Sequence, residues 1–338
     1  MRSIELTADR RLRVVERPRP APGPHDVVIQ VEAAGICGSD LRTRRYGSLP
    51  AGTVLGHEFV GRIAEVGPSV AALAIGDRVV VVPLAWCGRC AWCASGAQQL
   101  CTDMWDGSVG LGARPGAFAE YVVVAAASCR PFPADLPAWA GTLVEPFAVG
   151  LHATRRSRRT GQPDVPVAIL GAGPIGLMVL AAARLSGAAI PVVVAEPNPK
   201  RADAARRLGA TAVVPAAADV ALVLDATPEV AFDCTGSTAA LGEVSRLLAP
   251  HGELILVSVI EPDQAYNVPG RVWVSQELDC RGSSGYGAAD FNDALAAVAT
   301  RAVDLAAVIG GQRPLDEAEQ AFAELSGPDA PVKLVLKP

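Results

Sequence analysis

Four cysteines in the first third of the chain have the spacing of a metal-binding lobe. They follow one another as C-x2-C-x2-C-x7-C, at Cys87, Cys90, Cys93 and Cys101. Four thiolates that converge make a closed tetrahedral zinc site with no position left for a substrate. An iron–sulfur cluster, a disulfide pair or merely reactive thiols are the competing interpretations. The sequence therefore predicts a structural zinc that organises a lobe and performs no chemistry.

A second group of metal-ligating residue types lies nearer the N-terminus. Cys37 is followed by Gly38-Ser39-Asp40, and His57 and Glu58 occur about twenty residues later. A lone cysteine near a histidine more often contributes to packing than to a metal site. Zinc nevertheless accepts one thiolate, one imidazole and a carboxylate oxygen, and three protein ligands leave a fourth position for a substrate oxygen. A closed thiolate site and a coenzyme motif in the same chain favour ligation here.

A glycine-rich turn follows a short apolar run in the middle of the chain. Val167 to Leu170 lead into Gly171-Ala172-Gly173-Pro174-Ile175-Gly176, and a helical pattern continues from there. A G-x-G-x-x-G between a strand and a helix is typical of dinucleotide binding. Gly171 takes the tight turn, Gly173 leaves room for a pyrophosphate, and Gly176 lets the helix pack closely on the strand. Pro174 and Ile175 open the helix, whose N-terminal amides are donors for the phosphates.

Glu196 bears on the choice of coenzyme. It ends the predicted strand Val192 to Ala195 and lies 20 residues beyond the last glycine of the motif. A carboxylate in this position accepts hydrogen bonds from the adenosine ribose and repels a 2′-phosphate. Lys200 and Arg201 follow closely, and they either grip such a phosphate or lie on the solvated face of the next helix. The sequence favours NAD over NADP.

Composition limits the kind of partner. Half of the 338 residues are hydrophobic, 19% are charged, and the 27 prolines and 33 glycines are spread along the chain. These values predict two ordered domains with sizeable cores. A formal net charge of −5 gives no basic field for a phosphate backbone, so nucleic acid is not an expected partner.

The N-terminus and the cysteines indicate a compartment. The first residues lack the apolar run of a secretory signal, and glycines and prolines interrupt the most apolar stretch, residues 165–185. Neither export nor a membrane span is expected. The eight cysteines fit metal or thiol chemistry better than a disulfide framework, because the cytosol keeps thiols reduced. We expect a cytoplasmic enzyme that acts on a small molecule.

Hydrophobic patterning divides the chain into two kinds of region. Between residues 10 and 130, short β-branched runs alternate with turn signals, which is typical of an all-β region. From about residue 140, strands alternate with helical stretches, which indicates a parallel sheet with crossover helices. The expected strands are residues 27–31, 60–66, 78–82, 120–124, 166–170, 191–195 and 253–259, and the expected helices are residues 175–186 and 200–208.

Taken together, these motifs resemble those of the zinc-containing medium-chain dehydrogenase/reductase superfamily over essentially the whole chain. Glu145-Pro146 and Gly150-Leu151-His152 extend the resemblance, and the motifs occur in the family's order. Simple alcohol dehydrogenases of the family have a zinc-ligating cysteine where this chain has Glu145. The chain is therefore similar to the polyol, threonine and butanediol dehydrogenase branch.

The resemblance implies an α/β fold with two domains. A GroES-like, β-rich catalytic domain is expected over residues 1–146, and the chain is expected to return to it over residues 283–338. A Rossmann domain with a doubly wound parallel sheet is expected over residues 147–282, inserted between these parts. Such domains usually associate through the edge strand of the coenzyme domain, so a homo-oligomer, a dimer or a tetramer, is expected. The apolar stretch 268–274 either serves that interface or is buried core.

The resemblance also implies an NAD(P)-dependent zinc alcohol dehydrogenase with two zincs per chain. Cys37 and His57 would hold the catalytic zinc. The third ligand is left open between Glu58 and Glu145, which in sorbitol-type members reaches the metal through a water.

Two neighbours of Cys37 have implied roles in the reaction. Ser39 would take the proton of the bound alcohol before hydride passes to the nicotinamide. Asp40 would either accept a hydrogen bond from His57 and fix its tautomer, or cap a helix that begins near Leu41.

Two positions depart from the polyol pattern. Arg42 stands where polyol-type members often have a histidine. With Arg44 and Arg45 it is expected in a loop, where these cations either select an anionic substrate or face solvent. Tyr286 matches a substrate-pocket tyrosine of sorbitol-type enzymes, but the arginine that precedes it there is Gly285 here, so sorbitol is not favoured.

The expected substrate is a secondary alcohol or the corresponding ketone. A polyol, a sugar-derived alcohol (including an aminocyclitol) and a 3-hydroxy amino acid all stay open. Two other functions compete: a dinucleotide-binding protein without turnover, and a zinc-free quinone reductase. Both conflict with the predicted metal ligands.

Overall fold

The computed structural model describes residues 1–112, 114–162, 164–187, 190–224, 226–260, 264–266 and 268–338. Packing divides the chain into two compact units. Unit 1 comprises Met1–Glu145, Leu295–Arg301 and Ile309–Pro338, and unit 2 comprises Pro146–Ala294 and Ala302–Val308. The chain thus leaves unit 1 and returns to it near its C-terminus.

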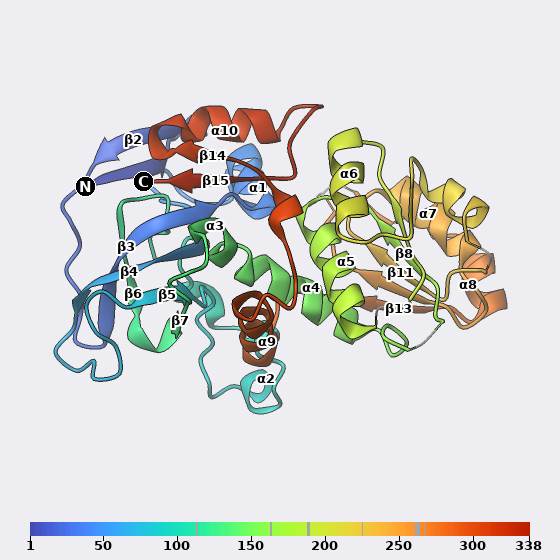
Figure 1. Cartoon of the computed structure of the whole chain (residues 1–338), viewed down its shortest axis with the longest axis horizontal. Helices are drawn as coiled ribbons and strands as arrows, with labels where there is room; N and C mark the ends of the chain where they lie inside the picture. Colours follow the sequence, from blue (N-terminus) through green and yellow to red (C-terminus); the bar gives the residue numbers. More distant parts are fainter. Residues whose placement is uncertain (113, 163, 188–189, 225, 261–263, 267) are drawn as a thin grey trace. The chain divides into compact units, whose positions relative to one another are not determined.

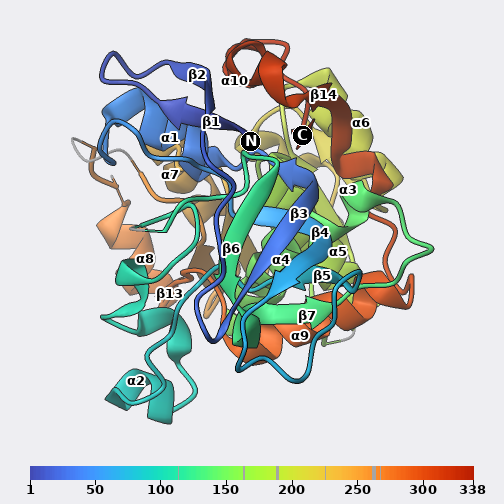
Figure 2. The ribbon, with the colours of Figure 1, turned by 90° about the vertical axis from the view of Figure 1, so that its left-hand side faces the viewer.

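Unit 1 is built around a seven-stranded, mostly antiparallel sheet (Figures 1 and 2). The strand order is β14-β15-β3-β4-β5-β7, and β6 pairs with β3 outside this path. The bounds are β3 (Asp26–Gly35), β4 (Glu58–Val66), β5 (Arg78–Val81), β6 (Tyr121–Ala125), β7 (Cys129–Pro131), β14 (Ile309–Pro314) and β15 (Lys333–Lys337). A separate hairpin joins β1 (Arg2–Leu6) and β2 (Leu12–Glu16). The four strands predicted in this region are confirmed.

The register of β3 brings the segments that carry the candidate ligands close together. Gly35, its last residue, pairs with Glu58 at the start of β4 and with Val335 of β15. Val27 and Ile29 of the same strand are buried in the core of unit 1. Three strands from distant parts of the sequence therefore meet beside the two ligand-bearing motifs.

Unit 2 contains a six-stranded parallel sheet in the order β10-β9-β8-β11-β12-β13. The bounds are β8 (Val167–Leu170), β9 (Val192–Ala195), β10 (Ala212–Val214), β11 (Val230–Asp233), β12 (Glu253–Leu256) and β13 (Asp279–Gly282). Strands β8, β9 and β11 are buried along their whole length, as expected of a sheet covered on both faces. In Figure 1, α5 (Pro174–Ser186) and α6 (Pro199–Arg207) cover one face, and α7 (Thr238–Leu247) and α8 (Gly270–Gln276) cover the other. This is the doubly wound arrangement that binds dinucleotides at the carboxyl ends of its strands.

Further helices lie between and around the strands. The remaining helices are α1 (Gly38–Tyr46), α2 (Ala91–Ala94), α3 (Ala138–Gly141), α4 (Val144–Arg156), α9 (Ala288–Ala299) and α10 (Ala318–Leu325). The 3-10 helices are η1 (Gln98–Leu100), η2 (Met104–Asp106), η3 (Ala126–Ser128), η4 (Ala217–Leu222), η5 (Ala306–Val308) and η6 (Leu315–Glu317). Within the described residues, no helix combines the length and the apolar character that a membrane crossing requires.

The predicted domain limits stay a prediction, and packing divides the C-terminal part at a later point. Residues 283–294 lie in unit 2, whereas the predicted return to the catalytic domain begins at residue 283. The cause is Asp290 in the first turn of α9. Its carboxylate lies 2.9 Å from Nδ1 of His152 and accepts a hydrogen bond from Arg155, both on α4.

The sequence-based prediction of a loop around Arg42, Arg44 and Arg45 is wrong, because these residues lie on α1. The helix begins early because Asp40 accepts a hydrogen bond from the backbone N–H of Cys37, at 2.9 Å, which satisfies an amide that a helix start leaves free. It ends at Gly47 in the left-handed conformation, with φ at +66°.

Two expectations for residues between 253 and 274 are also corrected. The strand predicted over residues 253–259 ends at Leu256, because the N–H groups of Val257 and Ser258 both donate to the carbonyl of Asp233. The stretch 268–274 is not buried core. Residues 270–274 lie on α8, and Val274 is 80% exposed.

Candidate metal centre and coenzyme site

The structure brings Cys37, His57 and Glu58 together. One ligand atom from each residue lies within 4.8 Å of the others. Cys37 precedes α1, His57 precedes β4, and Glu58 is its first residue, so the pairing of Gly35 with Glu58 holds both segments. The histidine and the glutamate are buried, and the cysteine is partly exposed. A thiolate, an imidazole and a carboxylate in one partly open group suit a catalytic zinc.

Asp40 and Ser39 lie on either side of the imidazole of His57. The Oδ1 of Asp40 is 3.5 Å from Nδ1 of His57, and the hydroxyl of Ser39 is 3.4 Å from Nε2. The other oxygen of Asp40 caps α1. Asp40 therefore caps the helix with one carboxylate oxygen and faces the imidazole with the other. Its predicted role in fixing the tautomer of His57 stays a prediction.

The charge state of His57 follows from its surroundings. Burial by itself would lower the pKa of His57, but attraction to Asp40 and Cys37 outweighs it and raises the pKa well above 6.5. A metal that binds here must displace a proton, because only a neutral imidazole is a ligand.

Sequence reasoning missed Lys333. Its side chain is completely buried and forms an ion pair with Oε2 of Glu58, and its ammonium donates to the carbonyl of Ile36 at 3.2 Å. Burial would lower the pKa of Lys333, but attraction to Glu58 and Cys37 outweighs it and raises the pKa. A lysine inside the apolar run of the last strand was the signal that could have found it.

Glu145, the other ligand candidate, lies in the first turn of α4 and is 9% exposed. It is close enough to Lys333 to help raise the pKa of that lysine. It lies outside the group formed by Cys37, His57 and Glu58. The arrangement therefore favours Glu58 over Glu145 as a direct metal ligand, and the choice stays a prediction.

The four cysteines of the lobe also converge. Their sulfur atoms lie within 4.8 Å of one another. Backbone N–H groups of Cys87, Cys90 and Cys93 each donate to a cysteine sulfur at 3.4 Å. Backbone donors lower the pKa of Cys87, whereas burial raises that of Cys93. All eight cysteines of the chain are free thiols, so a disulfide pair does not account for this lobe.

The glycine-rich turn has the predicted geometry. It links β8 to α5, with Gly173 as the residue before the helix and Pro174 as its first residue. A Cβ at Gly176 would collide with the carbonyl oxygen of Gly171, whereas a Cβ at Gly173 would meet nothing within 4 Å. The last glycine thus permits close packing, and the middle one leaves open space beside the amides of α5.

Glu196, which follows β9, contacts the same turn. It is 7% exposed, and its two oxygens accept hydrogen bonds from the backbone N–H groups of Ala172 and Asn198, both at 2.8 Å. Each oxygen keeps a lone pair for another donor. Arg201 lies in the first turn of α6, where its N–H donates to the side chain of Asn198 at 3.2 Å.

Known proteins match this chain over nearly all of its length. The model of the alcohol dehydrogenase GroES-like domain matches residues 23–134, and that of zinc-binding dehydrogenases matches residues 174–300. The 2-dehydro-3-deoxy-L-galactonate 5-dehydrogenase of Pseudoalteromonas atlantica is 32% identical, over 97% of this chain and 96% of its own. The chain belongs to the zinc-dependent medium-chain dehydrogenase/reductase family. A sorbitol dehydrogenase of Bacillus subtilis, 33% identical over 95% of this chain and 92% of its own, places this dehydrogenase near the polyol branch.

A solved structure agrees with the fold of this dehydrogenase. The zinc-binding dehydrogenase of Sinorhizobium meliloti 1021 bound to NADP has a TM-score of 0.89 and 31% identity, and the match covers 100% of this chain and 99% of that one. The predicted combination of a GroES-like and a Rossmann domain is confirmed. The protein is an NAD(P)-dependent zinc alcohol dehydrogenase by family, and the two competing functions lose their support.

Two arginines of α1, Arg44 and Arg45, contact identified protein groups in this dehydrogenase. Arg44 donates to Glu319 at 2.6 Å and to the carbonyl of Arg10 at 3.2 Å, and Arg45 stacks over Tyr46. Both are held by protein groups, which does not favour the alternative in which all three cations select an anionic substrate. Arg42 is the arginine that shares a helix face with Ser39, three residues before it.

Tyr286 lies in unit 2 and is fully buried, with its ring centroid 5.9 Å from that of Phe291. Its role in substrate binding stays a prediction.

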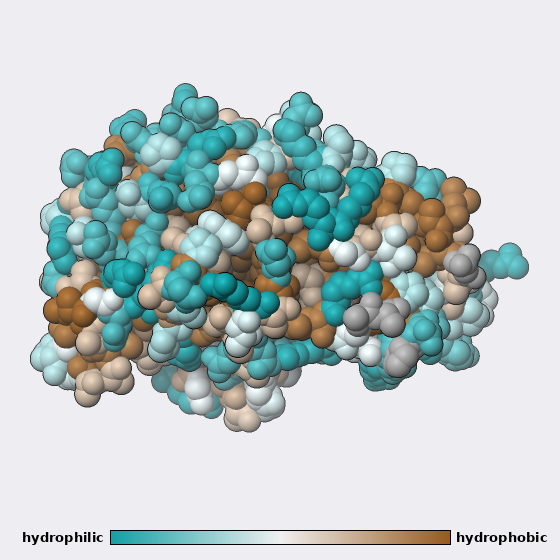
Figure 3. Space-filling model, viewed as in Figure 1, coloured by the Kyte–Doolittle hydropathy of each residue, from teal (hydrophilic) through white to brown (hydrophobic). Residues whose placement is uncertain are grey.

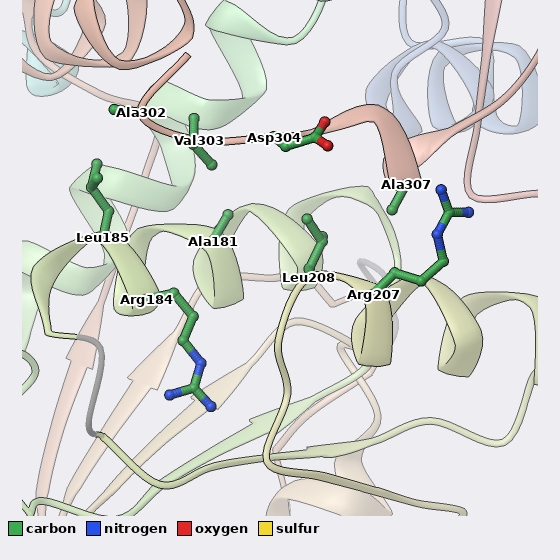
Figure 4. A pocket seen from close by; sticks show the side chains of 9 residues that line it. All are labelled: Ala181, Arg184, Leu185, Arg207, Leu208, Ala302, Val303, Asp304 and Ala307. Carbon is green, nitrogen blue, oxygen red and sulfur yellow. The ribbon is translucent and has the colours of Figure 1, made fainter. Parts of the chain in front are cut away.

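A cavity of about 390 Å³ in unit 2 contains none of the predicted site residues (Figure 4). Helices α5 and α6 and residues 302–307 form its walls. Arg184 turns away from it and donates to the carbonyl groups of Gly209 and Ile190. This arginine links α5 to the segments that precede the neighbouring strands. Its guanidinium group therefore has a structural role in the fold.

Proposed function

We propose that this dehydrogenase oxidises a secondary alcohol of a polyol or a sugar-derived compound, with a catalytic zinc on Cys37, His57 and Glu58 and a second, structural zinc in the four-cysteine lobe. The observation that carries the proposal is the partly open group of thiolate, imidazole and carboxylate within 4.8 Å. Relatives named for a sugar acid and for sorbitol support this substrate class. A 3-hydroxy amino acid stays a weaker candidate, because no named relative among these favours it.

The residues around the proposed zinc have separate tasks. When bound, zinc supplies a positive charge that acidifies a coordinated hydroxyl, and NAD supplies the hydride acceptor. Ser39 would relay the substrate proton, accepting it and giving up its own hydroxyl proton toward solvent, since its hydroxyl lies beside the imidazole of His57. Asp40, whose Oδ1 lies 3.5 Å from Nδ1 on the opposite side of the ring, would orient the imidazole for metal binding. Glu145 adds negative charge near Lys333.

We propose NAD as the preferred coenzyme, held by Gly171, Gly173, Gly176, Pro174 and Ile175 at the start of α5. Glu196 supports this preference, because a buried carboxylate at the end of β9 repels a 2′-phosphate. Because a related structure binds NADP, the activity with NAD has to be compared with the activity with NADP. We expect a higher kcat/KM with NAD than with NADP, and we expect Glu196→Gln to narrow the difference by about tenfold. A wild-type preference for NADP would show that Arg201 or Lys200 decides the coenzyme.

Arg42 is proposed to contact the substrate. Because it follows Ser39 by one helical turn on α1, a carboxylate on a sugar acid is the group that it would bind. We expect Arg42→Ala to raise KM for sugar acids and to leave KM for neutral polyols nearly unchanged. Equal losses with both classes would contradict a charge-specific contact.

A substrate screen tests the proposed reaction. Sugar acids, neutral polyols, aminocyclitols and 3-hydroxy amino acids are offered with NAD, and NADH formation is followed by its absorbance. We expect sugar acids or polyols to be oxidised fastest. No NADH from any of the alcohols, with zinc-loaded protein and with NADP also tried, would reject the proposal.

We also propose that the dehydrogenase forms a homo-oligomer through unit 2. Strand β13 is an exposed edge of the parallel sheet, and open edges favour pairing with another chain. Val274 and Val259 are 80% and 75% exposed, and Figure 3 shows hydrophobic residues at the surface of this unit. Light scattering should give a multiple of the chain mass.

We also propose a cytoplasmic location for the dehydrogenase. The free thiols fit this location, because the cytosol keeps thiols reduced.

A further inference from the structure

A buried lysine contacts the candidate zinc ligand Glu58 and has no part in the reaction described above. The side chains of Lys333 and Glu58 are 0% and 1% exposed. The ammonium of Lys333 pairs with Oε2 of Glu58 and donates to the carbonyl of Ile36. One cation therefore touches the residue before Cys37 and the residue after His57.

The sheet is built to accommodate this ion pair. Gly35 pairs with Glu58 on one side and with Val335 on the other. A Cβ at Gly35 would lie 2.5 Å from Oε2 of Glu58 and 2.9 Å from Cε of Lys333. Any larger residue at position 35 would push the two groups apart. The register and the glycine together place the lysine over the carboxylate.

Stability alone is a weak reason to keep such a pair. Burying two charges costs several kcal/mol each, and apolar residues of similar size are often as stabilising. Cys37 and Glu145 add negative charge around Lys333, so the lysine also balances the anions that face the proposed metal. Its effect is therefore expected on the metal rather than on the fold.

We propose that Lys333 is a positioning residue that retains Oε2 of Glu58, so that Glu58 offers zinc only its other oxygen. The fourth coordination position then stays open for the substrate hydroxyl. This inference rests on the proposed catalytic zinc. Without the lysine, both oxygens are available, and zinc accepts a fifth ligand. The surroundings of the metal also become more negative, which strengthens zinc binding and weakens the acidification of the alcohol.

The test removes the charge of Lys333 and measures the metal directly. Lys333→Met is loaded with zinc, and the affinity of the catalytic site is measured by competition with a chelator, with Cys37→Ser as the background for the structural site. We expect zinc to bind about tenfold more tightly and kcat to fall about tenfold. With Co²⁺ in place of zinc, we expect weaker visible absorption, because five-coordinate Co²⁺ absorbs less than tetrahedral Co²⁺.

Two further variants serve as controls. Lys333→Arg keeps the cation and should keep the zinc affinity and the Co²⁺ spectrum close to those of the wild type. In a Glu58→Gln background, removal of the lysine should have little further effect on zinc affinity, because the two residues act as a unit. Lys333→Gln, which keeps a hydrogen-bond donor, replaces Lys333→Met if the latter does not fold.

Several outcomes would overturn the proposal. Zinc affinity that is unchanged or weaker in the neutral variants, or an unchanged Co²⁺ spectrum, would show that the lysine merely offsets a buried charge. Failure of both neutral variants to fold with zinc bound, while Lys333→Arg folds, would make the lysine structural. A wild-type chain that binds only one zinc is a separate result, because it would reject the proposed function itself.

Discussion

The two groups of candidate metal ligands in unit 1 would hold the same metal, zinc, in opposite ways. The four-cysteine lobe offers only sulfur, and its sulfurs accept hydrogen bonds from its own backbone. The second group offers sulfur, nitrogen and oxygen, and its partners Asp40 and Lys333 are buried and come from separate elements. A metal site that only holds a lobe together needs protein ligands at all four coordination positions. A metal site that reacts needs one coordination position kept open for the substrate, so the residues around its ligands matter as much as the ligands.

The largest expected effect distinguishes the two groups by the property that is lost, which is activity for one group and stability for the other. Cys37→Ser should reduce alcohol oxidation below detection and leave folding and NADH binding intact. Cys101→Ser, in the lobe, should lower the thermal midpoint and expose the lobe to proteases, because the metal contributes folding free energy there. The measurements are NADH fluorescence, circular dichroism and limited proteolysis. Activity retained in Cys37→Ser would break the distinction.

Asp40→Asn should have an intermediate effect that is confined to the second group. The amide keeps the shape of the side chain but removes the charge that faces Nδ1 of His57. We expect a loss of about 10- to 100-fold in kcat or in zinc affinity. Ser39→Ala is the neighbouring control, and it should lower kcat without lowering zinc affinity. Equal zinc loss in both variants would show that the segment has merely loosened.

The pH dependence of zinc uptake sharpens the same contrast. His57 has a raised pKa in the metal-free protein, so its ring is protonated below that pKa and competes with zinc. Uptake at the second group should therefore weaken as the pH falls through the raised pKa and level off above it. In Asp40→Asn, the dependence should move toward the usual histidine range. Metal titrations at several pH values, with Cys37→Ser as background, provide the measurement.

The smallest expected effect concerns a charge pair beside the lobe. Arg89 and Asp103 are 3.5 Å apart and largely exposed, and such pairs contribute little. Arg89→Ala should leave the zinc content unchanged and shift the thermal midpoint by no more than about 1 °C. A loss of zinc from this variant would mean that surface charges also control the lobe.

The sequence predicted the parts of the site that depend on spacing along the chain. The lobe cysteines, the glycine-rich turn and the strand before Glu196 lie within short segments, so local pattern was enough. Lys333 escaped because it meets Glu58 only through the pairing of β15 with β3. The arginines of α1 were placed in a loop because the helix starts on a capping interaction from Asp40 to Cys37, not on a hydrophobic repeat. Contacts between distant strands leave little trace in a single sequence. The cap does leave one, because Asp40 is also a sequence-based candidate to cap a helix near Leu41.

Zinc stoichiometry tests the central claim most directly. Purified wild-type protein and Cys37→Ser are analysed for metal per chain, alongside NAD-dependent oxidation of the best substrate. The account predicts two zincs and turnover for the wild type, and one zinc without turnover for Cys37→Ser. A wild-type chain with a single zinc, or a Cys37→Ser chain that keeps both zincs and its activity, would contradict it.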